Sequence, residues 1–283
     1  MKLEQATLAL RPRTLPQCLD LSLVMLRAHG MTLLKLWALV AVPACVAVYL
    51  AVFYAECTLW LGVLAFWLAT IPLGMLLVAA AAPSAFGETP SVRGTFRHLG
   101  VGRGVLLLLK LFGCRILSAV CGILFVVPGI WVATRTGFVT EESVLSQLDN
   151  RLYDHRTDQL FKGELFDLFL RGVLIAGYCS LLFVVLFFTC DLIGSSLSFP
   201  ILIGRVITSI DPQYYTGGEM FQAVWLFMTA DPLVVTTLLA VALAVYPVGR
   251  LAWLLCYIDL RVRRDCWDME VSILNEARRL EET

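Results

Sequence analysis

The chain has 283 residues, of which 59% are hydrophobic and 16% are charged. Soluble domains average about 45–50% apolar and about 25% charged residues, so this composition favours a membrane protein over a soluble one. The formal net charge is zero, and the bulk charge therefore gives no sign of a nucleic-acid partner.

Apolar segments long enough to cross a membrane recur along the chain. A spanning helix needs about 20 predominantly apolar residues. Five segments clearly reach that length, at residues 31–54, 57–82, 104–127, 168–193 and 232–258. A sixth segment, 129–145, is shorter and contains charged residues. The pattern predicts an all-α, polytopic membrane protein, with residues 1–283 forming one integral membrane domain.

The distribution of basic residues decides whether the short segment spans. Lys and Arg mark cytoplasmic loops. They occur before the first span, between the second and third, over 146–167 and after the last span, whereas the 194–231 connection has only Arg205. If 129–145 crosses the membrane, every basic stretch falls on one side. We therefore predict six transmembrane helices with both termini in the cytoplasm.

Amphipathic segments flank the spans at both ends. Residues 14–29 begin with a Thr14–Gln17 capping box and carry a narrow polar face, which is typical of a helix lying in the membrane interface. Residues 260–282 alternate polar and apolar positions at helical spacing and predict a cytoplasmic amphipathic helix. The outer segment 194–231 is interrupted by Pro and Gly, and we expect short helices at the outer leaflet there.

Ionisable residues within the spans are candidates for a polar site, because each costs a few kcal/mol unless it is paired or hydrated. Arg115 in the third span and Glu141 and Glu142 in the fourth are expected at similar depth, and Arg250 of the last span is expected near them. Such a cluster either lines a cavity for a substrate or lipid headgroup, or forms a structural ion pair. Asp191, by contrast, is expected near the outer surface, either solvated or at the membrane interface.

The end of the last span carries three arginines in close succession. Arg261, Arg263 and Arg264 follow the interfacial Tyr257 and are candidates for binding anionic headgroups. Asp259 precedes them and is able to bond to them. No catalytic set, metal-ligand spacing or cofactor motif is present, and the nine cysteines, which include no C-x-x-C, are expected to be packing residues.

Three stretches resemble a known family. They are "RPRTLPQCLDLSLVMLRAHGMTLLKL" near the start, "VVPGIWVATRTGFVTEE" at 126–142, and "YIDLRVRRDCWDME" at the end of the last span. Together they resemble the bacterial integral membrane family related to the glycerophosphoryl diester phosphodiesterase membrane domain. The resemblance implies a six-helix inner-membrane domain with cytoplasmic termini and without catalysis of its own. The chain departs from the family pattern after Glu142.

These observations favour a non-enzymatic bacterial inner-membrane protein. The expected role is a scaffold or accessory subunit that binds membrane lipids, chiefly anionic headgroups. A protein partner could bind through the C-terminal amphipathic helix. The alternative is a small transporter or lipid-handling protein with a polar cavity around Arg115, Glu142 and Arg250.

Overall fold

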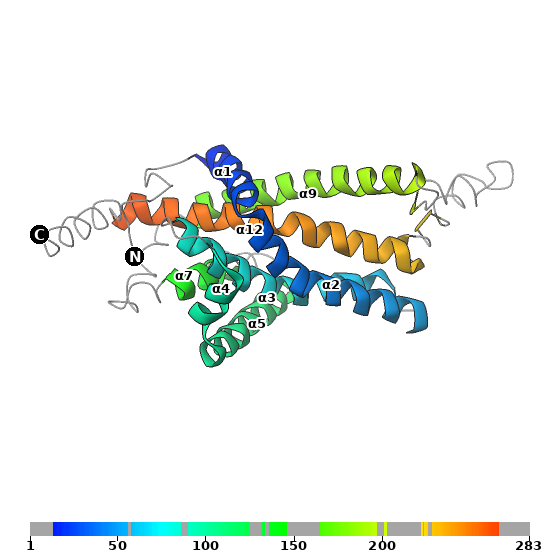
Figure 1. Ribbon diagram of the computed structural model, residues 1–283, viewed down its shortest axis with the longest axis horizontal. Coiled ribbons are helices and arrows are strands. Elements are labelled where there is room, and N and C mark those ends of the chain that lie inside the picture. Colours follow the sequence, from blue (N-terminus) through cyan, green and yellow to red (C-terminus); the bar gives the residue numbers. More distant parts are fainter. Residues whose placement is uncertain are drawn as a thin grey trace, which may run out of the picture. The chain divides into compact units, whose positions relative to one another are not determined.

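The computed structural model describes residues 14–55, 58–85, 90–124, 132–133, 136–145, 165–196, 201–202, 222, 224–225 and 228–265. Within these ranges every regular element is a helix and no strand occurs, which confirms the predicted all-α class. The helices, shown in Figure 1, are α1 (Leu15–Ala28), α2 (Gly30–Ala55), α3 (Leu59–Ala85), α4 (Val92–Leu99), α5 (Val101–Leu124), α7 (Val139–Leu145), α9 (Leu165–Ser196) and α12 (Pro232–Asp265).

Five helices are long and apolar enough to cross a membrane, namely α2, α3, α5, α9 and α12. They coincide with the five long apolar segments of the sequence and support a multi-pass membrane protein. The sixth predicted span, 129–145, lies partly outside the described residues, and its described part contains only the 7-residue helix α7. Six spans therefore stay a prediction.

The structure describes the predicted N-terminal helix completely and the predicted C-terminal helix only in part. Helix α1 begins where the capping box predicts, and the Gln17 Oε1 atom accepts a hydrogen bond of 3.0 Å from the Thr14 N–H. At the other end, α12 continues without a break from the apolar segment to Asp265. Residues 260–265 of the predicted tail helix are therefore helical and continuous with the last apolar segment, and the rest of that predicted helix lies outside the described residues.

The described chain divides into two compact units. Unit 1 comprises residues 1–36, 74–176 and 247–283, and unit 2 comprises residues 37–73 and 177–246. The divisions fall within α2, α3, α9 and α12, and three of them lie next to helix-perturbing residues, at Gly74, Gly177 and Pro247.

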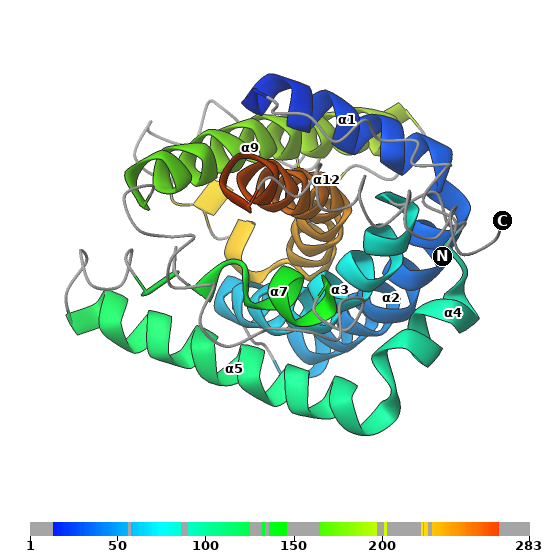
Figure 2. The same cartoon turned by 90° about the vertical axis from the view of Figure 1, so that its left-hand side faces the viewer.

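Unit 1 has its most buried stretch in the second half of α3. Residues 76–84 are all buried, and four consecutive alanines, Ala79–Ala82, are at most 2% exposed. Small side chains let neighbouring helices approach closely, which is a common way to pack helices in membranes. Within the same unit, α4 leads into α5 and α5 packs against α7, as Figure 2 shows.

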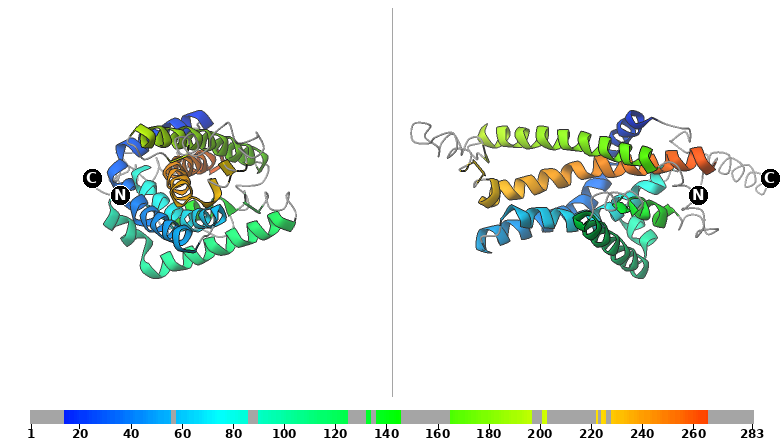
Figure 3. Two further views of the ribbon diagram at one scale, coloured as in Figure 1. Left: turned by 90° about the vertical axis from the view of Figure 1, so that its right-hand side faces the viewer. Right: turned by 180° about the vertical axis from the view of Figure 1, so that it is seen from behind.

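Unit 2 has an apolar core formed by the second half of α9 and the first half of α12, which run side by side in Figure 3. Its buried residues are Phe187, Leu202, Val234 and Val241. Asp191 also belongs to this unit, is 1% exposed, and accepts a 2.7 Å hydrogen bond from the Leu202 N–H. Asp191 is therefore not solvated in the structure, and whether it lies at the membrane interface stays a prediction.

A proline in α12 explains one specific hydrogen bond of unit 2. Pro247 has no N–H, so the carbonyl of Leu243, four residues earlier, has no donor within the helix. The indole Nε1 of Trp37 supplies this donor at 2.8 Å. The carbonyl freed by this proline is thus used for packing α2 against α12.

We expect Trp37→Phe to destabilise the protein by about 1–2 kcal/mol, because the Leu243 carbonyl then has no donor. The free energy of unfolding is measured by detergent titration followed by circular dichroism. In the Trp37→Phe background, Pro247→Ala restores a backbone N–H four residues from Leu243 and should recover part of the loss. No recovery would mean that the lost ring packing, and not the carbonyl, causes the destabilisation.

Candidate functional site

The candidate site lies in unit 1, where α7 packs on the second half of α12 through a buried ion pair. The Arg250 Nη2 atom lies 2.9 Å from each carboxylate oxygen of Glu141 and donates a hydrogen bond to Oε2. The Glu141 side chain is 0% exposed and that of Arg250 is 13% exposed. We call this contact the α7–α12 ion pair. Its charges neutralise each other inside the protein.

Aromatic contacts continue from the ion pair along the same face of α12. The Trp253 ring stacks on the fully buried Phe138 with centroids 4.6 Å apart, and the Tyr257 ring is tilted against Phe138 with centroids 5.2 Å apart. The Trp253 indole N–H also donates a 3.1 Å hydrogen bond to the Gly137 carbonyl. Because Arg250, Trp253 and Tyr257 follow one another at helical spacing, one stripe of α12 holds the whole turn that precedes α7.

Two further predicted members of the polar cluster lie on the packed elements α5 and α7. Arg115 of α5 and Glu142 of α7 are both half-buried. All four predicted residues of the polar cluster therefore lie in unit 1. Of these four, Glu141 and Arg250 form the ion pair described above.

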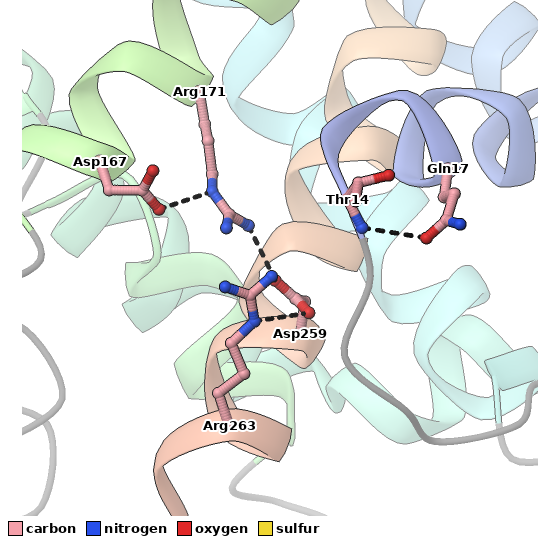
Figure 4. Close-up of polar contacts among 6 residues, drawn as sticks. All are labelled: Thr14, Gln17, Asp167, Arg171, Asp259 and Arg263. Atoms are coloured by element: carbon pink, nitrogen blue, oxygen red, sulfur yellow. Dashed lines mark hydrogen bonds and ion pairs between the residues drawn. The ribbon is translucent and has the colours of Figure 1, made fainter.

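A second charged group lies between α9 and α12, also in unit 1. Figure 4 shows Arg171 between two carboxylates: its Nε donates to Asp167 at 2.8 Å and its Nη1 donates to Asp259 at 2.8 Å. Asp259 also accepts a 3.2 Å hydrogen bond from the Arg263 Nε. We call these four residues the Arg171 cluster. Two arginines and two aspartates give it a net charge of zero when all are ionised.

The three tail arginines predicted to bind headgroups have different surroundings. Arg263 is 39% exposed, but its guanidinium is paired with Asp259, as the sequence suggested. Arg261 is half-buried, and the side chain of Arg264 lies outside the described residues. Pairing reduces the charge that Arg263 offers to a lipid, since Asp259 already neutralises it.

Arg171 is the residue of this site that sequence reasoning missed. It occurs near the start of an apolar segment, four residues after Asp167, and this spacing is the usual signal for an ion pair on one helix. Its link to Asp259 joins residues 88 positions apart and has no local signal. The next residue, Gly172, leaves room for the Trp253 ring, whose atoms lie 3.5 Å from the position of an added Cβ.

The described part of the chain was also compared with the donor sets that hold metal ions. No group of three or more His, Cys, Asp or Glu side chains is placed to hold a metal ion there. Cys18 of α1 and Cys256 of α12 are both fully buried in unit 1. What the arrangement does chemically is to balance buried charges and to hold helices in register.

Comparisons with known protein families, with characterised proteins and with solved structures found no match for this chain.

Proposed function

We propose that the protein is a non-enzymatic scaffold or accessory subunit of a bacterial inner membrane, which holds lipids and a protein partner at the cytoplasmic side. The single observation that supports this role over transport is the complete burial of Glu141 against Arg250. A transport site has to admit water and substrate to its charged groups, whereas the Glu141 carboxylate is closed off from solvent and lies against the Arg250 guanidinium.

The Arg171 cluster supports the same role. Its buried member, Asp259, bonds to one arginine from α9 and to one from α12 itself. Charges arranged in this way fix the register of the two helices, although a hydrophobic replacement can be equally stable. A rigid helical frame with internal charge balance suits a protein that presents surfaces to lipids and partners.

Co-purification tests this function. The full chain is isolated from its native membrane in a mild detergent, and bound lipids and proteins are identified by mass spectrometry. A scaffold should retain a stoichiometric partner or a specific lipid class after repeated washing, and should do so equally in the Asp167→Asn variant, which changes an exposed residue. Recovery as a monomer without a specific lipid or partner would contradict the proposal.

One observation favours the alternative, a small transporter or lipid-handling protein. The Nε atom of Arg250 is buried and has no hydrogen-bond acceptor among the described residues. This donor could bind an anionic substrate beside Glu141. A hydrated path is detected by placing a cysteine at position 141 and measuring its reaction with a water-soluble maleimide. Rapid labelling would favour the transporter, whereas resistance to labelling is expected of the scaffold.

We further propose the six-span topology, in which 129–145 crosses the membrane and both termini are cytoplasmic. It is supported by the placement of the basic stretches on one side. It also agrees with the resemblance to the membrane family related to the glycerophosphoryl diester phosphodiesterase membrane domain. Reporter fusions within 146–164 and within 203–220 test it, since the first site should report the cytoplasm and the second the outer side.

A further inference from the structure

Helix α4 presents a basic and aromatic face. Its inner side is formed by Thr95 and Leu99, which are 3% and 5% exposed, and Ser91 caps it by accepting a 3.0 Å hydrogen bond from the Gly94 N–H. The opposite side carries Arg93 and Arg97, both exposed, with Phe96 between them at 46% exposure. Residues three and four positions apart share one face of a helix, so Arg93 neighbours both Phe96 and Arg97.

The start of α5 extends this pattern. Gly100 adopts a φ of +59°, a conformation that favours glycine, and it joins α4 to α5 directly. Arg103 and Lys110 are exposed, and Leu106, which is 69% exposed, lies between them along the helix. Cations next to exposed apolar side chains are typical of helices that bind a membrane surface.

The cations of this face are not neutralised by carboxylates nearby. Neither α4 nor α5 contains an Asp or Glu. No ion pair joins Arg93, Arg97, Arg103 or Lys110 to another described residue. By contrast, Arg171, Arg250 and Arg263 are each paired with a carboxylate. Arg27 and Lys35 are likewise exposed and lack an ion pair with a described residue, but α4 and the first turns of α5 carry four such cations in close succession.

We propose that this basic face, formed by Arg93, Phe96, Arg97, Arg103, Leu106 and Lys110, binds the headgroups of anionic phospholipids. The guanidinium and ammonium groups attract phosphate, and the two apolar side chains enter the layer of lipid just beneath. The inference rests on the proposed membrane role. It assigns headgroup binding to α4 and α5 and not to the tail arginines for which the sequence predicted it.

The test measures lipid preference directly. The purified full chain is incorporated into nanodiscs of phosphatidylcholine with or without phosphatidylglycerol, and lipids that remain bound after transfer to detergent are counted by native mass spectrometry. The wild-type chain should retain phosphatidylglycerol preferentially. Each cation near an anionic surface contributes about a fivefold preference, so Arg93→Gln with Arg97→Gln should reduce the preference about thirtyfold.

A matched control separates position from net charge. The variant Arg278→Gln with Arg279→Gln removes the same charge from a distant part of the sequence and should leave the preference unchanged. An equal loss in both double variants, or no preference in the wild-type chain, would overturn the headgroup site while leaving the membrane role intact. Failure of the chain to enter either kind of nanodisc would instead contradict the proposed function itself.

Discussion

Replacing Arg250 with alanine should lower the free energy of unfolding by about 3–5 kcal/mol. The substitution leaves the Glu141 carboxylate, which is 0% exposed, without the cation that lies 2.9 Å from it. A buried charge without a partner is costly because neither water nor another dipole compensates it. Unfolding by sodium dodecyl sulfate, followed by tryptophan fluorescence in a mild detergent, measures the loss.

The paired replacement distinguishes an ion pair from two independent residues. Glu141→Leu together with Arg250→Met removes both charges and keeps apolar volume beside Phe138 and Trp253. Such a variant should be within about 1 kcal/mol of the wild-type chain, since an apolar pair often replaces a buried ion pair without loss. Additive losses in the double variant would show that the two residues act separately and would contradict the structural role of the pair.

Length and hydropathy were sufficient to predict the five long helices, because a membrane span needs a continuous apolar segment and leaves a strong signal. The capping box at Thr14 likewise fixed the start of α1, since it depends on residues three positions apart. The membrane boundary predicted at the arginines after Ile258 stays a prediction, and the structure adds that α12 continues through them as one helix to Asp265.

It was harder to predict from the sequence which residues of the site contact one another than how deep in the membrane each residue lies. Counting residues along each span gave Arg115, Glu141 and Arg250 a similar depth, but it does not say which helices are neighbours. The hydrogen bond from Trp37 to the Leu243 carbonyl shows the same limit. Pro247 reveals from sequence that a carbonyl lacks its helical donor, whereas the identity of the residue that supplies the donor depends on packing between helices distant in sequence.

The Arg171 cluster provides the second prediction, because the same arginine bonds to two aspartates that differ in burial. Asp259 is 1% exposed and Asp167 is 49% exposed, while each accepts a 2.8 Å hydrogen bond from Arg171. Asp259→Ala should cost about 3–5 kcal/mol, since it leaves the mostly buried Arg171 without its interior partner.

The matched variant Asp167→Ala should cost at most about 1 kcal/mol, because water replaces an exposed carboxylate at little cost. Detergent titration of the two single variants therefore tests whether burial, and not the length of the hydrogen bond to Arg171, sets the contribution of each aspartate. Adding Arg171→Met to Asp259→Ala should restore part of the stability, as the charge left in the interior is then removed. Equal losses for the two aspartates would mean that water reaches Asp259 in the membrane-embedded protein, and the Arg171 cluster would then be a hydrated site of the kind that a lipid-handling protein requires.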